Sequence, residues 1–173
     1  ISVKFNINGV VKNNVNTYSL QNLDYKLSSP TNSERYCDYD EVNGFCILSG
    51  ILNFSETMIF ESKTIIDPGT KIILNQGGNL IFKSSLLING TKESPVTIEG
   101  NSSGGIFIKN NKEQVSIIKN TTFNNLATLN SLLYRYTGSV NGYGGMFILE
   151  DVNISNGKAE DQLNLINAKI NIT

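Results

Sequence analysis

The chain has 173 residues, and the 39% that are hydrophobic suffice to bury the core of one domain, which argues against disorder. Fourteen basic and fifteen acidic residues give a net charge of −1 with no polybasic run, so we expect no nucleic-acid partner. No apolar run approaches the roughly 20 residues that span a bilayer, so we expect no membrane insertion.

The first 50 residues predict an N-terminal cap. The stretch VKFNINGVV at 3–11 predicts one strand and a turn, whereas residues 13–40 are polar and match no other phrase of the sequence. The end of a repeat array is an exposed sheet edge, and a segment of this kind is expected to cover it. We therefore place a cap segment at 1–50 and a repeat domain at 51–173.

Two cysteines, Cys37 and Cys46, flank an Asn43-Gly44 turn signal that could bring them together. A disulfide between them would staple the cap. It would close a loop of about ten residues, contribute roughly 2.5 to 3 kcal/mol, and imply an oxidising, extracytoplasmic compartment. The alternative is two reduced cysteines packed as small apolar groups, because spacing alone does not fix the redox state. Of the two, we expect the disulfide.

Short apolar runs, each followed by Asn, Gly, Ser or Lys, predict a series of β-strands after the cap. None of these runs has the periodicity of a helix. The runs lie at 58–60, 64–66, 71–74, 79–82, 86–88, 96–98, 105–108 and 115–118.

The runs also repeat at longer distance. Gly69-Thr70 returns as Gly90-Thr91, and the phrase at 147–155 returns at 165–173. A looser copy of that phrase precedes it at 116–124, at a wider spacing that an insertion at 131–145 accounts for. Periods near 20 indicate a solenoid of short strands. We therefore predict an all-β fold, a right-handed parallel β-helix of roughly five or six coils.

The two ends of the sequence suggest a fragment. It begins at Ile1 rather than Met and stops at Thr173 in the middle of a repeated phrase. Our interpretation is that the β-helix is truncated at its C-terminal end. Further coils, or self-association with another molecule, would then cover that end.

Residues 64–100, TIIDPGTKIILNQGGNLIFKSSLLINGTKESPVTIEG, resemble the opening coils of right-handed parallel β-helix repeat proteins of bacterial surfaces, which have the pectate-lyase-like superfamily fold. Residues 160–164, EDQLN, are similar to a phrase of the same group. The resemblance covers roughly 51–173 and implies the fold. It does not imply one function, because the group includes polysaccharide lyases, epimerases, hydrolases, adhesins and uncharacterised surface proteins. Their catalytic grooves use carboxylates with Arg, Lys or His, often with calcium.

The chemical candidates are Arg135, Lys158, Glu160 and Asp161, together with Glu150-Asp151. Residues one coil apart lie about 4.8 Å apart on the same face, so their carboxylates could bind calcium or do acid–base work on a sugar. The alternative, which we favour, is that these acids are solvated corner residues. We name no catalytic residue and no metal motif, because the sequence has no histidine, no Cys-x-x-Cys, no EF-hand loop and no glycine–aspartate calcium repeat.

Three tyrosines in the insertion, Tyr134, Tyr136 and Tyr143, could stack on sugar rings, although for each one taken alone we favour packing of a loop. We therefore interpret the chain as an extracellular, cell-surface or periplasmic module, a structural or binding scaffold that contacts carbohydrate and needs no cofactor. The alternative is part of a polysaccharide-processing enzyme: a lyase, an epimerase or a glycoside hydrolase. Carboxylates that converge with Arg135 or Lys158 on one face would favour the enzyme, and an apolar, uncharged face would favour the scaffold.

Overall fold

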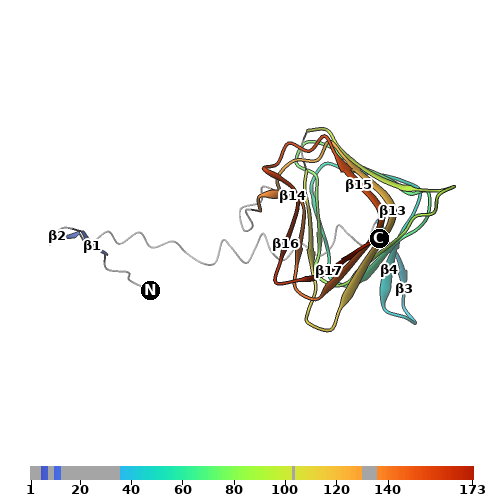
Figure 1. Ribbon diagram of the computed structural model, residues 1–173, viewed down its shortest axis with the longest axis horizontal. Helices are drawn as coiled ribbons and strands as arrows, with labels where there is room; N and C mark the ends of the chain where they lie inside the picture. Colours follow the sequence, from blue (N-terminus) through green and yellow to red (C-terminus); the bar gives the residue numbers. More distant parts are fainter. Residues whose placement is uncertain (1–4, 8–9, 13–35, 103, 130–135) are drawn as a thin grey trace. The chain divides into compact units, whose positions relative to one another are not determined.

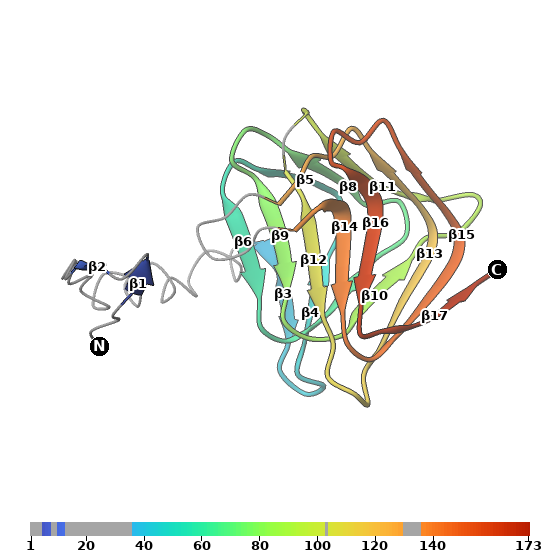
Figure 2. The ribbon, with the colours of Figure 1, turned by 60° about the vertical axis from the view of Figure 1, so that its left-hand side comes forward.

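The computed structural model describes residues 5–7, 10–12, 36–102, 104–129 and 136–173. The chain divides into two units, Ile1–Pro30 and Thr31–Thr173. In the first unit, β1 (Phe5–Ile7) and β2 (Val10–Lys12) form an antiparallel pair. The second unit carries the rest of the described strands (Figures 1 and 2).

The second unit is built from strands, as the sequence predicts. Within the described residues no helix is long and apolar enough to cross a bilayer. The strands are β3 (Asp38–Asp40), β4 (Phe45–Leu48), β5 (Ile51–Phe54), β6 (Thr57–Phe60), β7 (Lys63–Ile66), β8 (Lys71–Leu74), β9 (Asn79–Phe82), β10 (Leu86–Asn89), β11 (Val96–Gly100), β12 (Ile106–Lys109), β13 (Val115–Asn124), β14 (Gly138–Tyr143), β15 (Met146–Ser155), β16 (Asp161–Ile166) and β17 (Lys169–Ile172).

The strands form three ladders, each of parallel neighbours, which we number by the order in which the chain enters them. The first ladder is β4-β7-β10-β13-β15-β17, and the antiparallel strand β3 pairs with its first member. The second is β5-β8-β11-β13-β15. The third is β6-β9-β12-β14-β16, whose strands stand side by side in Figure 2. The expectation of an all-β fold with parallel sheets is confirmed.

The long strands β13 and β15 belong to both the first and the second ladder because each bends in the middle. The bends are at Asn120 and Asp151, whose φ angles are +42° and +51°. Asparagine and aspartate tolerate this left-handed conformation better than most residues do. Register places both bends over Gly90, where an added Cβ would lie 2.3 Å from the carbonyl oxygen of Asn120. The bend at Asp151 therefore lies beside the bend at Asn120. Residue 90, the neighbour of Asn120 on the other side, has to be glycine because a side chain there would clash with the Asn120 backbone.

Buried and more exposed side chains alternate along the strands, so each ladder has an inner and an outer face. In β4, for example, Cys46 and Leu48 are buried while Phe45 and Ile47 remain half-exposed. The inward side chains of all three ladders meet in one main core. Its fully buried large residues include Leu48, Phe54, Met58, Phe60, Ile66, Ile72, Leu74, Leu80, Phe82, Leu86, Phe123 and Phe147.

A second, smaller core lies on the outer side of the third ladder. Ile81 and Phe107 point outward from β9 and β12, and Leu129, from the segment between β13 and β14, packs on them. Tyr136 follows the same segment, and its ring stacks on Phe107 with centroids 4.4 Å apart and planes 17° apart. This packing fixes where the segment re-enters β14.

The β3–β4 hairpin extends the first ladder beyond β4, and the predicted disulfide is confirmed. Cys37 and Cys46 are bonded, with Cα atoms 5.3 Å apart. The ring of Tyr36 meets Phe54 edge-on at 4.9 Å. Part of the expected cap, residues 13–35, lies outside the described residues. Because β4 already pairs in parallel with β7, the first ladder begins at Phe45, ahead of the boundary expected at residue 51.

The hairpin turn is held by Asp40, whose carboxylate accepts hydrogen bonds from the side chain and backbone of Asn43 and from the backbone of Val42. These bonds, the Asn43 side chain first, lower the pKa of Asp40. Because the pKa of Asp40 is lower in the folded than in the unfolded chain, its ionised carboxylate stabilises the turn at pH values above the unfolded pKa of about 3.9. This stabilisation is lost as the pH falls through the folded pKa.

We therefore expect amide hydrogen exchange at Gly44, whose N–H donates to the Asp40 carbonyl, to accelerate relative to the intrinsic rate as the pH falls below about 4. The Asp40→Asn variant should lack this acid-dependent change. An NMR titration of the Asp40 carboxyl measures the same effect directly. A pKa at or above about 3.9 would contradict this account of the turn.

The strand register corrects two predictions. The alignment of 116–124 with 147–155 is right, since Ser116 pairs with Phe147. The alignment of 147–155 with 165–173 is wrong, because Phe147 pairs with Ile170 and not with Leu165. Leu165 instead pairs with Gly142 in the third ladder. The predicted insertion at 131–145 likewise contains β14, a strand of the third ladder, rather than a loop throughout.

Candidate functional site

Two residues that the sequence analysis singled out, Tyr143 and Asp161, lie on the neighbouring strands β14 and β16, together with other polar residues. Register pairs Asn141 with Asn164 and Tyr143 with Ile166. Lys109 of β12 pairs with Tyr143 on the other side. Since neighbouring positions in a parallel ladder lie about 4.8 Å apart, Tyr143 is flanked by a lysine and an isoleucine.

Tyr143 is the exposed aromatic residue of this surface. It is 38% exposed, and its hydroxyl accepts a hydrogen bond of 3.3 Å from the Nδ2 of Asn167. Asn167 has a φ of +51° and forms the turn after β16. The tyrosine thus presents an apolar ring whose polar tip is already oriented, a combination suited to stacking on a ligand ring.

A chain of hydrogen bonds lies at the other end of the same strands. The Nδ2 of Asn164 donates to Oγ1 of Thr137 at 2.9 Å, and that hydroxyl donates to Oδ2 of Asp161 at 2.8 Å. The backbone N–H of Asp161 also donates to the Thr137 carbonyl, at 3.1 Å. The Asp161 carboxylate is exposed and oriented, with acceptor capacity left for a ligand.

We call Thr137, Tyr143, Asp161, Asn164 and Asn167 the β14–β16 strip. Asp161 pairs with Gly138 and Ile166 with Tyr143, so the strip's two ends are five strand positions apart, or about 17 Å. The strip is therefore elongated. It can contact an extended molecule at several points, but its carboxylate and its tyrosine cannot act on the same atom.

The other predicted site residues do not join the strip. Lys158 and Glu160 are exposed in the turn before β16, where the Lys158 backbone N–H donates to the Leu126 carbonyl at 2.7 Å. The ring of Tyr136 has one face covered by Phe107. Arg135 and Tyr134 lie outside the described residues.

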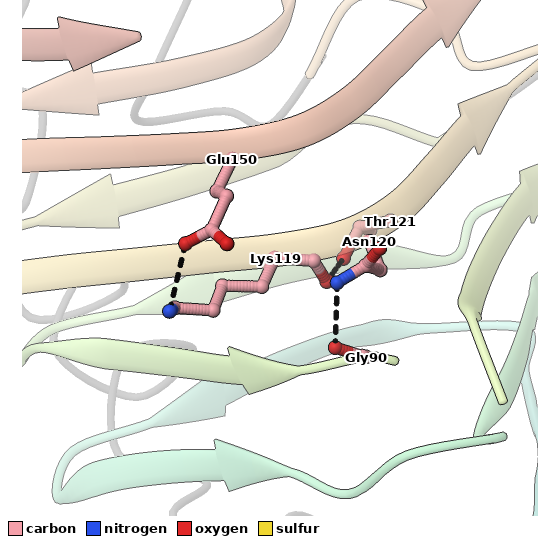
Figure 3. Close-up of polar contacts among 5 residues, drawn as sticks. All are labelled: Gly90, Lys119, Asn120, Thr121 and Glu150. Atoms are coloured by element: carbon pink, nitrogen blue, oxygen red, sulfur yellow. Dashed lines mark hydrogen bonds and ion pairs between the residues drawn. The ribbon is translucent and has the colours of Figure 1, made fainter. Parts of the chain in front are cut away.

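Glu150 has a structural partner rather than a place in a site. Its carboxylate lies 2.7 Å from the Nζ of Lys119 on the neighbouring strand (Figure 3). Beside this pair, the Nδ2 of Asn120 donates to the Gly90 carbonyl at 3.0 Å. Both charged side chains are about 40% exposed, so we expect the pair to contribute between about 0.2 and 1 kcal/mol.

Among the described residues, no group of three or more His, Cys, Asp or Glu side chains is placed to hold a metal ion. The sequence singled out Tyr143 and Asp161 but missed Thr137, Asn164 and Asn167. These three belong to no motif, and Thr137 is 27 residues away from Asn164 along the chain. Strand pairing alone brings them together, so no sequence signal could have identified them.

A scan against protein-family models gives no match, and none of the curated proteins or solved structures compared with the chain is similar enough to indicate a family.

Proposed function

We propose that the three ladders are the faces of a right-handed parallel β-helix, with each coil contributing one strand to each ladder. The regular parallel pairing and the single main core support this arrangement. The right hand follows from the general preference of parallel β-crossovers, about 98% of which are right-handed. The resemblance of residues 64–100 to bacterial surface β-helix proteins supports the same fold.

We further propose that this module is an extracellular scaffold whose β14–β16 strip binds carbohydrate. The observation that carries the proposal is the strip itself, which aligns an exposed tyrosine ring with amide and carboxylate groups along about 17 Å of strand. A sugar chain offers apolar ring faces and hydroxyl groups in the same alternation. The disulfide supports an oxidising compartment, where such polymers are met.

The spread of the strip favours binding over the enzymatic alternative. Glycoside hydrolysis uses two carboxyl groups about 5 to 9.5 Å apart across the scissile bond. The strip contains a single carboxylate, that of Asp161, and the Thr137 hydroxyl already donates a hydrogen bond to it. A bound chain would therefore be held rather than cleaved.

The test is calorimetric titration of the protein with cellohexaose and with hexagalacturonate, each with and without calcium. We expect one of them to bind, and Tyr143→Ala to weaken that binding at least tenfold, or about 1.4 kcal/mol, because the stacking ring is removed. Tyr39→Ala is the matched control, since Tyr39 is 50% exposed on β3 and lies outside the strip.

Binding that Tyr143→Ala leaves unchanged would refute the strip as the binding surface. Failure of both hexasaccharides to bind would count against the carbohydrate proposal. Appearance of shorter products during the titration would favour the enzyme instead, and calcium dependence would point to a carboxylate site. Thermal denaturation of both variants checks that each remains folded.

A further inference from the structure

The outer face of the first ladder carries a continuous row of aliphatic side chains. We call this the aliphatic row: Ile47, Ile65, Leu87, Ile117 and Ile148, which are successive register partners on β4, β7, β10, β13 and β15. All five are half-exposed and belong to neither core. At about 4.8 Å per strand the row is roughly 19 Å long.

Apolar neighbours widen the row, and polar residues end it. Phe45, Val115 and Met146 project from the same face one outward position earlier on the strands, and Val115 is 40% exposed. Lys63 and Ser85 stand between Phe45 and Val115 in that row, and the Lys63 ammonium lies 5.9 Å from the centroid of the Phe45 ring. Asp38 of β3 stands beside Ile47 at one end, and Asn171 of β17 beside Ile148 at the other. A bounded apolar patch of this kind on an exposed sheet face is typical of an interaction surface.

We propose that the aliphatic row is the contact between two copies of this chain, packed sheet against sheet about a two-fold axis that is parallel to the strands and passes over Leu87. With β3 included, the face has seven strands, and β10 is the central one. The axis therefore places β3 of one copy over β17 of the other, β4 over β15, and β7 over β13. Leu87 meets its own counterpart.

Charge complementarity singles out this arrangement. Asp40 of β3 stands beside Phe45, and Lys169 of β17 beside Met146, so the axis sets Asp40 of one copy opposite Lys169 of the other. The turn residue Asp67 follows β7 and comes opposite Lys119 of β13.

The residues on each side of Leu87 match in the same way. Asp38 meets Asn171, Phe45 meets Met146, and Ile47 meets Ile148 of the second copy. Lys119 already pairs with Glu150 within its own copy, so Asp67 would join an existing ion pair (Figure 3). A two-fold axis along the ladder instead would set Asp38 against Asp38, and like charges oppose that alternative.

The first test is sedimentation velocity of the full chain and two variants across a range of concentrations. We expect the wild-type chain to dimerise and Leu87→Lys to weaken dimerisation about 100-fold or more, because two like charges meet where the sheets close. Ile73→Lys is the matched control: Ile73 is a half-exposed aliphatic residue on the second ladder, between Asn53 and Glu99. It should dimerise as the wild type does.

A monomeric wild-type chain at every concentration would overturn the proposal, as would equal effects of the two lysine variants. The second test fixes the axis, using a bis-methanethiosulfonate that spans about 5 Å, which is too short to join cysteines that are offset by two strands, or about 10 Å, across the contact. Leu87→Cys should cross-link to itself. Ile65→Cys should cross-link when mixed with Ile117→Cys and not by itself; cross-linking of Ile65→Cys alone would overturn the proposed axis. The native cysteines are bonded to each other and do not compete.

Discussion

Replacing Phe82 with alanine is expected to lower the free energy of unfolding by about 3 to 5 kcal/mol, the usual range for truncating a buried aromatic side chain. Phe82 has no exposed surface, and its ring stacks on Phe60 with centroids 5.1 Å apart. The two rings occupy successive strands of the third ladder, with Ile108 next in the row. Each strand supplies one layer of the core, so neighbouring layers cannot readily refill the cavity. Urea denaturation measures the change.

Phe45→Ala is the matched control, because Phe45 is the same residue type at a half-exposed position on the outer face of β4. Since Phe45 also lies in the proposed dimer contact, both variants are compared at concentrations at which the chain is monomeric. We expect it to cost less than half as much as Phe82→Ala. A double-mutant cycle with Phe60→Ala should give a coupling energy of about 0.5 to 1.5 kcal/mol from the stacked rings. If Phe82→Ala cost no more than Phe45→Ala, the placement of Phe82 in the core would be wrong.

The positions of the strands could be predicted because two-residue alternation is a local signal. The runs expected at 71–74 and 79–82 coincide with β8 and β9, and five others differ from their strands by one or two residues at an end. The run expected at 115–118 covers only the first four residues of the ten-residue β13. In β8 and β9, for example, the inward positions are Ile72, Leu74, Leu80 and Phe82, all of which belong to the main core.

Self-similarity predicted the register of β13 against β15 but not that of β15 against β17, because the distance between paired strands varies along the chain. In the first ladder Ile47 pairs with Ile65 and Ile117 pairs with Ile148, and the second pair is much farther apart in sequence than the first. Corner segments of different length absorb the difference. A match at a constant shift, such as 147–155 with 165–173, then aligns strands from different ladders.

The strand β14 was missed because its residues resemble a loop. Asn141 is buried, yet its side chain donates to the Ile106 and Gly138 carbonyls and accepts from the Gly138 N–H, so burial leaves it satisfied. At Gly142 an added Cβ would lie 2.6 Å from the ring of Phe147, which occupies that space. Such polar and glycine positions depend on tertiary neighbours, and the β14–β16 strip depends on them in turn.

Removal of the disulfide, in the double variant Cys37→Ala and Cys46→Ala, is expected to lower the free energy of unfolding by roughly 2.5 to 3 kcal/mol, the chain-entropy value for a closed loop of about ten residues. Cys46 is an inward residue of β4 in the main core, and Cys37 packs against that core from the hairpin. The bond therefore ties the hairpin to the first strand of the first ladder. Urea denaturation without reductant measures the loss.

Reduction of the wild-type protein provides the matched experiment, since it breaks the bond without changing a side chain. Dithiothreitol should destabilise the wild type by nearly the same amount and leave the double variant unaffected. The hairpin should loosen first, because Tyr36, which contacts Phe54, directly precedes Cys37. Under reducing conditions, amide hydrogen exchange should therefore become faster in β3, which belongs to the hairpin, than in β8, which does not. A wild-type stability that does not respond to reductant would show that the bond contributes nothing to holding the end of the core.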